Sequence, residues 1–292
     1  WDFTVRSAES EADYNISETI NPSLGRLSPT SFKPGTLTQE ETSVNLDFIT
    51  EVELSGLSSP LNVAFGYEWR DETYKIGAGD AASIQAGPTA AFFGVGSDGF
   101  QGFTVASAGS FESESNAVYV DVESNFTDRF SAGIAVRYED FDDFDSTSDV
   151  KLSARYAFTE AFAVRATVNT GFRIPTPGQV NTLNVTTTSD TSGNLIPNGT
   201  YPVSNPIALT LGAIPLEPEE STSYTIGWTW VPTDTFSLTF DYYNIEIDDR
   251  LALLNNTVTA AEVALLTTAG IPNANLLLGS SANFFVNGYD SE

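Results

Sequence analysis

The feature of this sequence that most constrains its fold is a repeated alternation of apolar and polar residues over runs of about ten positions. The run 116–126 is typical, because valine recurs at every second position and alternates with Tyr119, Asp121 and Glu123. Successive side chains of a strand point to opposite faces, so this period predicts strands with one apolar and one polar face. Similar runs lie at 1–8, 44–54, 61–70, 131–139, 150–158, 162–172, 223–231 and 235–241, and a last one begins at 283. We therefore expect an all-β chain with nine complete antiparallel strands and the start of a tenth.

The lengths of the runs and of their connections favour a membrane barrel over a soluble β-sandwich. Most of the runs are about 9 to 11 residues long, whereas soluble strands are mostly about 5 or 6 residues and a membrane-crossing strand needs about 9 to 11. Short turns are predicted at 55–60, 127–129, 159–161 and 232–234, and long loops at 10–41, 73–113, 140–148, 174–219 and 251–282. Antiparallel pairing places the short turns at one end and the long loops at the other, as in outer-membrane barrels.

Aromatic residues support the same interpretation, because they gather near strand ends on the apolar face. The residues concerned are Phe65, Tyr67, Trp69, Phe158, Phe162, Trp228, Trp230 and Phe236. Aromatic girdles at the two membrane interfaces have this distribution, although a soluble sandwich would place such residues in its core. Both ends of the sequence fall within a strand pattern, and we expect an interior fragment of a barrel.

Composition excludes several functions. The 292 residues include no Cys, Met or His, so a Ser-His-Asp triad, a thiolate metal site and a His-ligated zinc site are excluded within this chain. The 12 Lys and Arg face 39 Asp and Glu, a net charge of −27, which argues against nucleic acid because phosphate binding needs a basic surface. There is no apolar run of about 18 residues, so a membrane protein with this sequence would have to be a barrel.

Two loops contain local signals. Thr259 and Glu262 have capping-box spacing and Gly270 is a stop, which predicts a short helix in the last loop. The loop 73–113 is rich in Gly, Ala and Ser with scattered phenylalanines, and we expect it to be either mobile or folded inward over the lumen.

Two segments resemble a known family. The sequence G-F-R-I-P-T-P-G-Q-V-N at 171–181 is similar to a stretch in the barrel of TonB-dependent outer-membrane receptors, through Gly171, Phe172, Arg173, Pro175 and Pro177. The sequence L-E-P-E-E-S-T-S-Y-T-I-G at 216–227, with Pro218 and Glu219, resembles a second segment of that family. Weaker likenesses lie at 21–32 and 240–247. Together these four segments are spread along most of the chain, in the order expected for the family.

This resemblance implies a bacterial outer-membrane receptor with a barrel of about 22 strands and an N-terminal plug. Such receptors import scarce nutrients, most often ferric siderophores, with energy from the TonB complex. Residues 1–292 would be a partial barrel domain, with the plug, the TonB box and the closing strands outside it. The implied partners are outer-membrane lipid, lipopolysaccharide, an extracellular small molecule and TonB through the missing N-terminal part. We expect a monomer with no cofactor. A passive porin-like channel is the alternative.

Several polar groups were considered as sites. Arg173 lies at the same rim as Glu217, Glu219 and Glu220, and a pair there would be a stabilising contact rather than a ligand site. The lumen face is expected to carry a mixed-sign ladder made of Asp121, Glu123, Arg137, Arg155, Arg165 and Asp241, which could contact a plug or line a wet channel.

No catalytic or metal site is predicted. The acidic loop 139–149 could offer oxygen ligands to calcium, but a solvated hairpin tip is the simpler interpretation, because the Gly and terminal Glu of an EF-hand loop are absent. No carboxylate pair is isolated in an apolar pocket, as glycoside hydrolysis would need, so we expect no enzyme. Ligand contacts would come from loop aromatics, for which we name Phe100, Phe103, Tyr201 and Tyr289.

Overall fold

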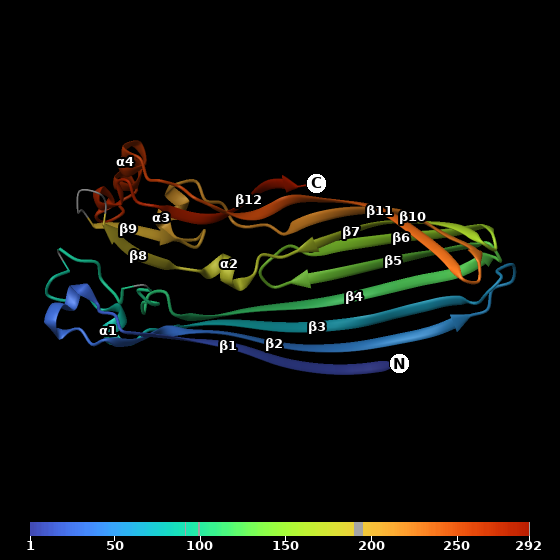
Figure 1. Ribbon diagram of the computed structural model, residues 1–292, viewed down its shortest axis with the longest axis horizontal. Coiled ribbons are helices and arrows are strands. Elements are labelled where there is room, and N and C mark those ends of the chain that lie inside the picture. Colours follow the sequence, from blue (N-terminus) through green and yellow to red (C-terminus); the bar gives the residue numbers. More distant parts are fainter. Residues whose placement is uncertain (91, 99, 190–194, 292) are drawn as a thin grey trace.

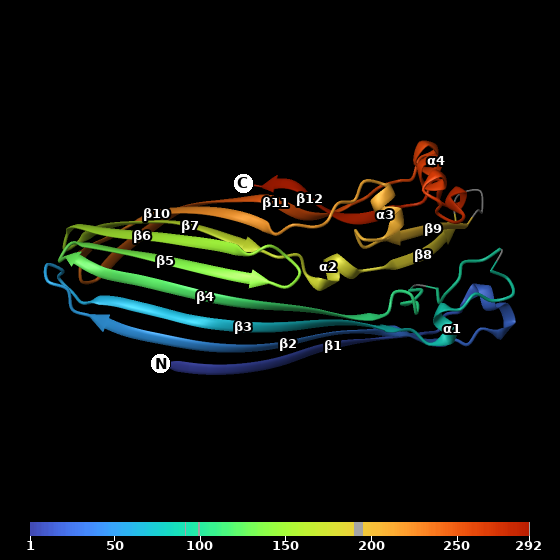
Figure 2. The same ribbon diagram turned by 180° about the vertical axis from the view of Figure 1, so that it is seen from behind.

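The computed structural model describes residues 1–90, 92–98, 100–189 and 195–291. Long strands lie side by side in one curved sheet, and the helices gather at one end of it (Figures 1 and 2). The strands of this wall are β1 (Asp2–Ser17), β2 (Ser31–Val52), β3 (Leu61–Ala78), β4 (Gly109–Thr127), β5 (Phe130–Phe141), β6 (Thr147–Thr159), β7 (Phe162–Arg173), β10 (Glu219–Thr233), β11 (Phe236–Leu254) and β12 (Ala282–Ser291).

Each wall strand pairs antiparallel with the next one in the wall, which confirms the predicted hairpins and their number. Two further strands were not predicted. They are β8 (Asn184–Ser189) and β9 (Leu195–Thr200), which form a hairpin within the loop between β7 and β10. This hairpin joins the wall where β9 pairs in parallel with β12 at Gly199 and Ala282.

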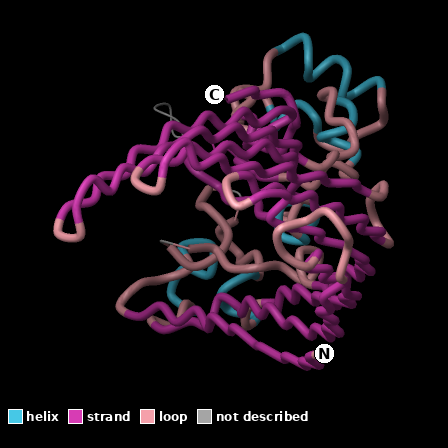
Figure 3. The backbone as a smooth tube through the Cα atoms, turned by 90° about the vertical axis from the view of Figure 1, so that its right-hand side faces the viewer, coloured by secondary structure: helices cyan, strands magenta, loops and turns pink. Residues whose placement is uncertain are grey.

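The end-on view in Figure 3 shows that the sheet curves around an open space. In the described residues the two ends of the strand order, β1 and β8, do not meet. The structure is therefore part of a barrel wall in shape, with a concave inner face and a convex outer face.

The two faces of the wall differ in chemistry. Outer side chains are large, apolar and exposed: Val120 is 40% exposed, Ile226 53% and Phe240 52%. Aromatic rings also stack there, with ring centroids 5.2 Å apart for Phe48 and Phe65 and 5.9 Å for Trp228 and Phe240. A continuous apolar surface of this kind is unfavourable in water, and lipid is the surrounding that suits it.

The strands are longer than their alternating runs. β2 has 22 residues, although its predicted run was 44–54, and β1 continues to Ser17. The halves of these strands next to the loop 18–30 carry polar residues on both faces, as in Thr38–Ser43. These halves therefore show no alternation of apolar and polar residues. The predicted loops 10–41 and 73–113 were therefore too long, and they reduce to 18–30 and 79–108.

Loop lengths follow the predicted asymmetry with one exception. The turns 128–129, 160–161 and 234–235 are two residues each, while 79–108, 174–218 and 255–281 are long. The connection 142–146 lies on the long-loop side but is shorter than the turn 53–60 on the opposite side. The predicted difference in length between the two ends therefore does not hold for these two connections.

The short helices all lie at the loop end. They are η1 (Pro22–Leu27), α1 (Ala81–Ile84), α2 (Pro177–Asn181), α3 (Pro206–Thr210), α4 (Ala260–Thr268) and η2 (Ala274–Leu277). α4 confirms the helix predicted from the capping box, with Thr259 as N-cap and Glu262 at N3. In the described part of the chain, no helix has the length and apolar character needed to cross a membrane.

The loops form two lobes on opposite sides of the opening (Figure 1). We call residues 18–30 and 79–108 the first lobe, and residues 174–218 and 255–281 the second lobe. The described residues of the first lobe are folded against one another. Its segments are joined by backbone hydrogen bonds such as Thr89 N–H to Ser23 O and Asp98 N–H to Ile20 O. The second lobe contains the largest apolar cluster of the described residues.

Candidate functional site

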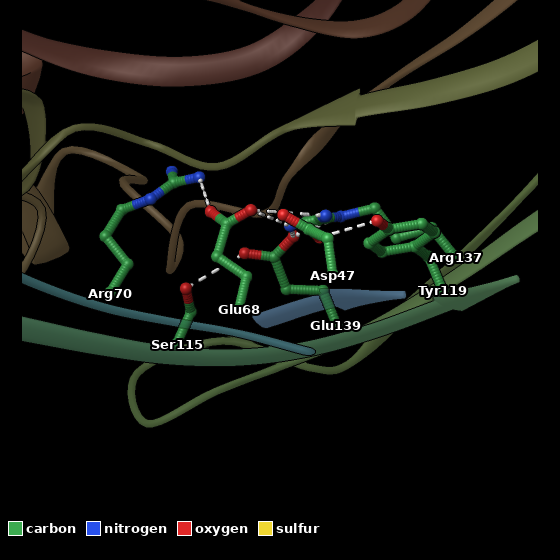
Figure 4. A network of polar contacts seen from close by, with 7 residues as sticks. All are labelled: Asp47, Glu68, Arg70, Ser115, Tyr119, Arg137 and Glu139. Atoms are coloured by element: carbon green, nitrogen blue, oxygen red, sulfur yellow. Dashed lines mark hydrogen bonds and ion pairs between the residues drawn. The ribbon is translucent and has the colours of Figure 1, made fainter. Parts of the chain in front are cut away.

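The inner face of β2–β5 carries a network of charged and hydroxyl groups (Figure 4). The Arg137 guanidinium donates to Glu139 Oε2 over 2.8 Å and lies 3.4 Å from Glu68 Oε2. Arg70 donates to the other oxygen of Glu68 over 2.6 Å. Ser115 Oγ donates to Glu139 Oε1 over 2.9 Å. Four charges therefore neutralise one another, and Glu139 is buried although it is ionic, which requires such partners.

The strand register explains why these groups meet. Glu68, Ala117 and Glu139 occupy one row across β3, β4 and β5, and Ala117 is too small to separate the two carboxylates. The next row is Asp47, Gly66, Tyr119 and Arg137. Arg137 can therefore reach the carboxylates of both Glu68 and Glu139 from this neighbouring row.

Gly66 allows a second contact in that lower row. Tyr119 donates its hydroxyl to Asp47 Oδ1 over 2.6 Å across the intervening strand. A Cβ at position 66 would lie 2.6 Å from both the Tyr119 ring and Asp47 Oδ1, which is far inside van der Waals contact. The tyrosine can lie flat on the wall only because position 66 has no side chain.

The same arrangement recurs at the other side of the wall. Arg165 of β7 and Asp241 of β11 form a bidentate pair over 2.6 and 2.8 Å. The residue between them in register is Gly227 of β10, where a Cβ would meet Asp241 Oδ1 at 2.0 Å. Arg137, Arg165 and Asp241 of the predicted ladder thus form ion pairs along the wall. Neither glycine was recognised from the sequence.

The predicted rim contact is present. Arg173 Nη1 lies 3.5 Å from Glu219 Oε2, at directly opposite positions of β7 and β10. The side chains are unequal, because Arg173 is 57% exposed and Glu219 only 8%. The other oxygen of Glu219 accepts the Leu251 backbone N–H of β11 over 2.7 Å. Glu219 therefore joins three strands, as a structural contact.

A second residue strengthens this rim and was not predicted. Asn287 of β12 exchanges two hydrogen bonds with the Glu217 backbone, at 2.8 and 2.9 Å, and donates to Asp249 O over 2.7 Å. Asp249 has a positive φ of 53°. Pro218 thus lies between Glu217 and Glu219, which both form contacts with neighbouring strands. Through these contacts the second family-like segment, at the start of β10, is bonded to β7, β11 and β12.

The first family-like segment is a helix start. Thr176 is the N-cap of α2, Pro177 its first residue, and Gln179 completes a capping box. Pro175 is fully buried, and Phe172 packs edge-on against Phe141 with centroids 5.6 Å apart. Thr-Pro-Gly-Gln at 176–179 is a capping signal that could have been recognised from the sequence, but no helix was predicted there.

Of the four aromatic residues named for ligand contact, Phe100 and Phe103 lie together in the first lobe, and Tyr201 lies in the second. Phe100 packs on Phe103 and Tyr14, with centroids 5.4 and 5.2 Å away. Phe103 is buried in the first lobe and Tyr201 in the core of the second. Tyr289 lies in β12, and its side chain is outside the described residues. Tyr201 is therefore apart from the Phe100–Phe103 pair, and ligand contact stays a prediction.

Two titratable groups outside the wall are shifted by their surroundings. The backbone N–H and hydroxyl of Thr259 hold the pKa of Glu262 below its usual value, because both donate to the carboxylate. Burial raises the pKa of the Tyr201 phenol. In the described residues, no group of three or more acidic side chains could hold a metal ion, the loop 139–149 included.

Comparisons with known proteins agree with these features. The family model described as TonB dependent receptor-like, beta-barrel, matches residues 1–283. No curated protein matches the chain.

Several solved receptors have a similar fold. The siderophore receptor PirA from Pseudomonas aeruginosa is 15% identical, with a TM-score of 0.58 over 88% of this chain. A mutant ferric enterobactin receptor (PfeA) from the same organism, in complex with enterobactin, is 10% identical, with a TM-score of 0.60 over 99%. A double mutant of the Serratia marcescens hemophore receptor HasR, in complex with its hemophore HasA and heme, is 12% identical, with a TM-score of 0.56 over 99%. The match covers only 38%, 38% and 41% of those chains.

Proposed function

Because this chain belongs to the TonB-dependent receptor β-barrel family, whose members lie in the outer membrane, we propose that it forms part of the wall of an active-transport receptor. The receptor would bind a scarce nutrient outside the cell and import it with energy supplied through TonB. Since the chain spans about two fifths of the solved receptors, residues 1–292 would be a partial barrel domain, with the plug and the TonB-contacting part elsewhere in the protein.

One observation supports this proposal most directly. The inner face of the wall is polar and carries ion pairs, and two folded lobes lie at one end of the wall. Lobes on both sides of the opening offer opposed surfaces between which a bulky solute can be bound before it enters.

We propose a ferric siderophore as the substrate. PirA and PfeA are siderophore receptors by name, which supports this class, whereas HasR is a hemophore receptor. Among the aromatic candidates, Phe100 is placed best to contact a ligand because it is only partly buried and rests on Phe103. Phe103 and Tyr201 would act by supporting their lobes, and Tyr289 remains a candidate.

The remaining partners follow from the two faces of the wall. The apolar outer face would contact outer-membrane lipid, and the polar strand ends above it would contact lipopolysaccharide. TonB would be reached through residues outside this chain. We expect the receptor to act as a monomer and to catalyse no reaction, since the family consists of transport receptors.

Uptake in living cells tests the proposal. The full-length protein is produced in a Gram-negative host without its own siderophore receptors, and the uptake of radiolabelled iron is measured with several siderophores and with heme. We expect uptake of at least one ferric siderophore that stops when the host lacks TonB or when a protonophore removes the proton gradient. Uptake that continues under both conditions would identify a passive porin-like channel and contradict the proposal. Uptake of heme alone would contradict the substrate class.

A further inference from the structure

The dipeptide Asn-Gly occurs twice in the chain, at 198–199 and at 287–288. Asparagine is chemically labile in this sequence, because the glycine nitrogen can attack the carbonyl carbon of the asparagine side chain and close a five-membered imide. Glycine favours ring closure because it has no side chain and its backbone adopts conformations that other residues avoid. The two sites have the same chemistry, so any difference between them must come from the structure around them.

The site at Asn198 is held in place. Both of its residues are paired with β8 in the β8–β9 hairpin. The Gly199 N–H, which would have to attack, donates to Ser281 O over 2.8 Å. Gly199 is also buried, and a Cβ there would lie 2.5 Å from the Tyr201 ring. The attacking nitrogen is therefore engaged, and the backbone around it has no room to bend.

The site at Asn287 lies in an irregular part of β12. Val286 and Tyr289 have partners on β11, whereas residues 287 and 288 between them have none. A bulge of this kind leaves the extra residue outside the ladder. Gly288 is exposed and has a positive φ of 139°, and no atom lies within 4 Å of the place where a Cβ would be. The backbone here has the room that ring closure needs.

The hydrogen bonds of the Asn287 side chain act on the reaction in opposite directions. Its oxygen accepts the Glu217 backbone N–H over 2.9 Å, which stabilises the negative charge that develops on this oxygen when the carbonyl carbon is attacked. Its nitrogen donates to Glu217 O over 2.8 Å and to Asp249 O over 2.7 Å. These two bonds oppose the loss of the nitrogen and make the reaction slow.

We propose that Asn287 is a site of spontaneous deamidation, and that its conversion releases β12 from the segment that leads into β10. The Gly288 nitrogen gives its proton to solvent and forms a bond to Asn287 Cγ. The bond from Cγ to Nδ2 breaks, and the amide nitrogen takes up a proton and leaves as ammonia. Water then opens the imide at either carbonyl and gives aspartate or isoaspartate. Water is the only other reactant.

The product cannot keep the contacts of Asn287. An ionised carboxylate accepts hydrogen bonds and donates none. At position 287 it would face the carbonyl oxygens of Glu217 and Asp249, so both donated bonds would be lost and oxygen would lie against oxygen. Glu217 belongs to the loop 174–218 of the second lobe, which would thereby lose this attachment to β12. The site does not depend on what the protein transports, because the age of the molecule controls the reaction.

Mass spectrometry of the two dipeptides tests the site. The full-length protein in lipid vesicles is incubated at mildly alkaline pH, and the deamidated fraction at 287 and at 198 is followed over time. We expect Asn287 to convert at least several-fold faster than Asn198, and faster still as the pH rises, because the attacking nitrogen must lose its proton. In protein unfolded in urea the two sites should convert at similar rates, which is the control for an effect of the fold.

Two results would overturn the assignment of this site. One is conversion of Asn198 as fast as Asn287, or faster, in the folded protein. The other is an Asn287 that stays intact in the folded protein over the time in which the unfolded protein is converted.

Asn287→Asp, which has the side chain of one product, tests the consequence. Hydrogen exchange of residues 215–219 should increase at least several-fold. Asn15→Asp is the matched control, since it adds the same charge at an exposed position of β1, and it should leave this exchange unchanged. Equal exchange in the two variants would contradict the release of β12. Neither measurement depends on uptake, so its failure would leave the proposed function untouched.

Discussion

The two lobes above the wall are held together in different ways. In the first lobe the fully buried side chains include Asn21, Ser23 and Ser83, and hydrogen bonds join its segments. In the second lobe and the adjoining start of β12 they include Leu266, Val258 and Phe284, which pack in an apolar cluster. A hydrogen-bonded lobe depends on the direction of a few bonds, whereas an apolar lobe depends on volume. In the first lobe, a substitution should therefore destabilise only where it removes one of these hydrogen bonds. In the second lobe, the loss of stability should increase with the volume of the side chain that is removed.

The largest effect is expected from the second lobe. Phe284→Ala should destabilise it by about 3–5 kcal/mol and Leu266→Ala by about 2–5 kcal/mol, because each leaves a cavity in a packed core. Leu265→Ala is the matched control, since Leu265 is on the same helix but 56% exposed. Hydrogen exchange of residues 255–281 measures the effect. Equal protection in the Leu265 and Leu266 variants would contradict an apolar core.

In the first lobe, Asn21 is the residue whose loss should cost most. Its amide donates to Ala82 O over 2.8 Å and to Gln85 O over 3.2 Å, and its oxygen accepts from Ser23 N–H and Oγ. Asn21→Ala leaves buried partners unpaired, at about 1–3 kcal/mol for each such group.

Asn21→Asp sharpens this prediction, because it keeps the acceptor and loses both donated bonds. We expect its hydrogen exchange in 81–85 to rise nearly as much as in Asn21→Ala, while exchange at Ser23 stays low. Exposed Asn15→Ala is the control. If Asn21→Ala leaves the exchange of the first lobe unchanged, the polar account of this lobe is wrong.

A smaller, pH-dependent effect is expected at α4. Thr259→Ala should cost about 1 kcal/mol as a lost helix cap. Because the pKa of Glu262 is lowered in the folded lobe from 4.5, its contribution is present above that value and is lost as the pH falls through the folded pKa. The protection of α4, taken relative to the intrinsic exchange rate at each pH, should therefore fall below pH 4.5 more steeply than in Glu262→Gln. Identical pH profiles would contradict the capping contact.

The smallest effect is expected at the rim below the second lobe. Arg173→Gln should cost less than about 1 kcal/mol, because the arginine is mostly in solvent. Glu219→Ala should cost clearly more, since it leaves the Leu251 N–H without its acceptor. Thermal unfolding of the two variants gives the comparison. A larger loss from Arg173→Gln would show that the ion pair, and not the three-strand contact, holds the rim.

The wall and the lobes also differ in how far they could be predicted from sequence. The alternation of valines with Tyr119, Asp121 and Glu123 predicts a strand and its faces, because that pattern is local. The capping boxes at Thr259 and Thr176 are local too, and one of them was recognised. The two-sided polar ends of β1 and β2 have no period, so those strands were predicted too short.

The contacts that make the site depend on register, which no local pattern specifies. Gly66 allows Tyr119 to reach Asp47, and Gly227 allows Asp241 to reach Arg165, only because each glycine lies opposite both partners. The bonds from Asn21 to Ala82 and Gln85 join segments about 60 residues apart. Likewise, the apolar cluster brings Leu266 together with Tyr201, although their loops are separated by two strands, and it adds Phe284 of β12.

Cysteine scanning tests the central claim of a membrane wall with one lipid face and one aqueous face. Residues 1–292 contain no cysteine. Once any cysteine outside them has been replaced, single substitutions at 118–123 can be introduced into the full-length protein, labelled with a fluorophore and studied in lipid vesicles. We expect lipid-soluble quenchers to act at 118, 120 and 122, and aqueous iodide to act more strongly at 119, 121 and 123. Equal quenching by iodide at all six positions would contradict a membrane wall.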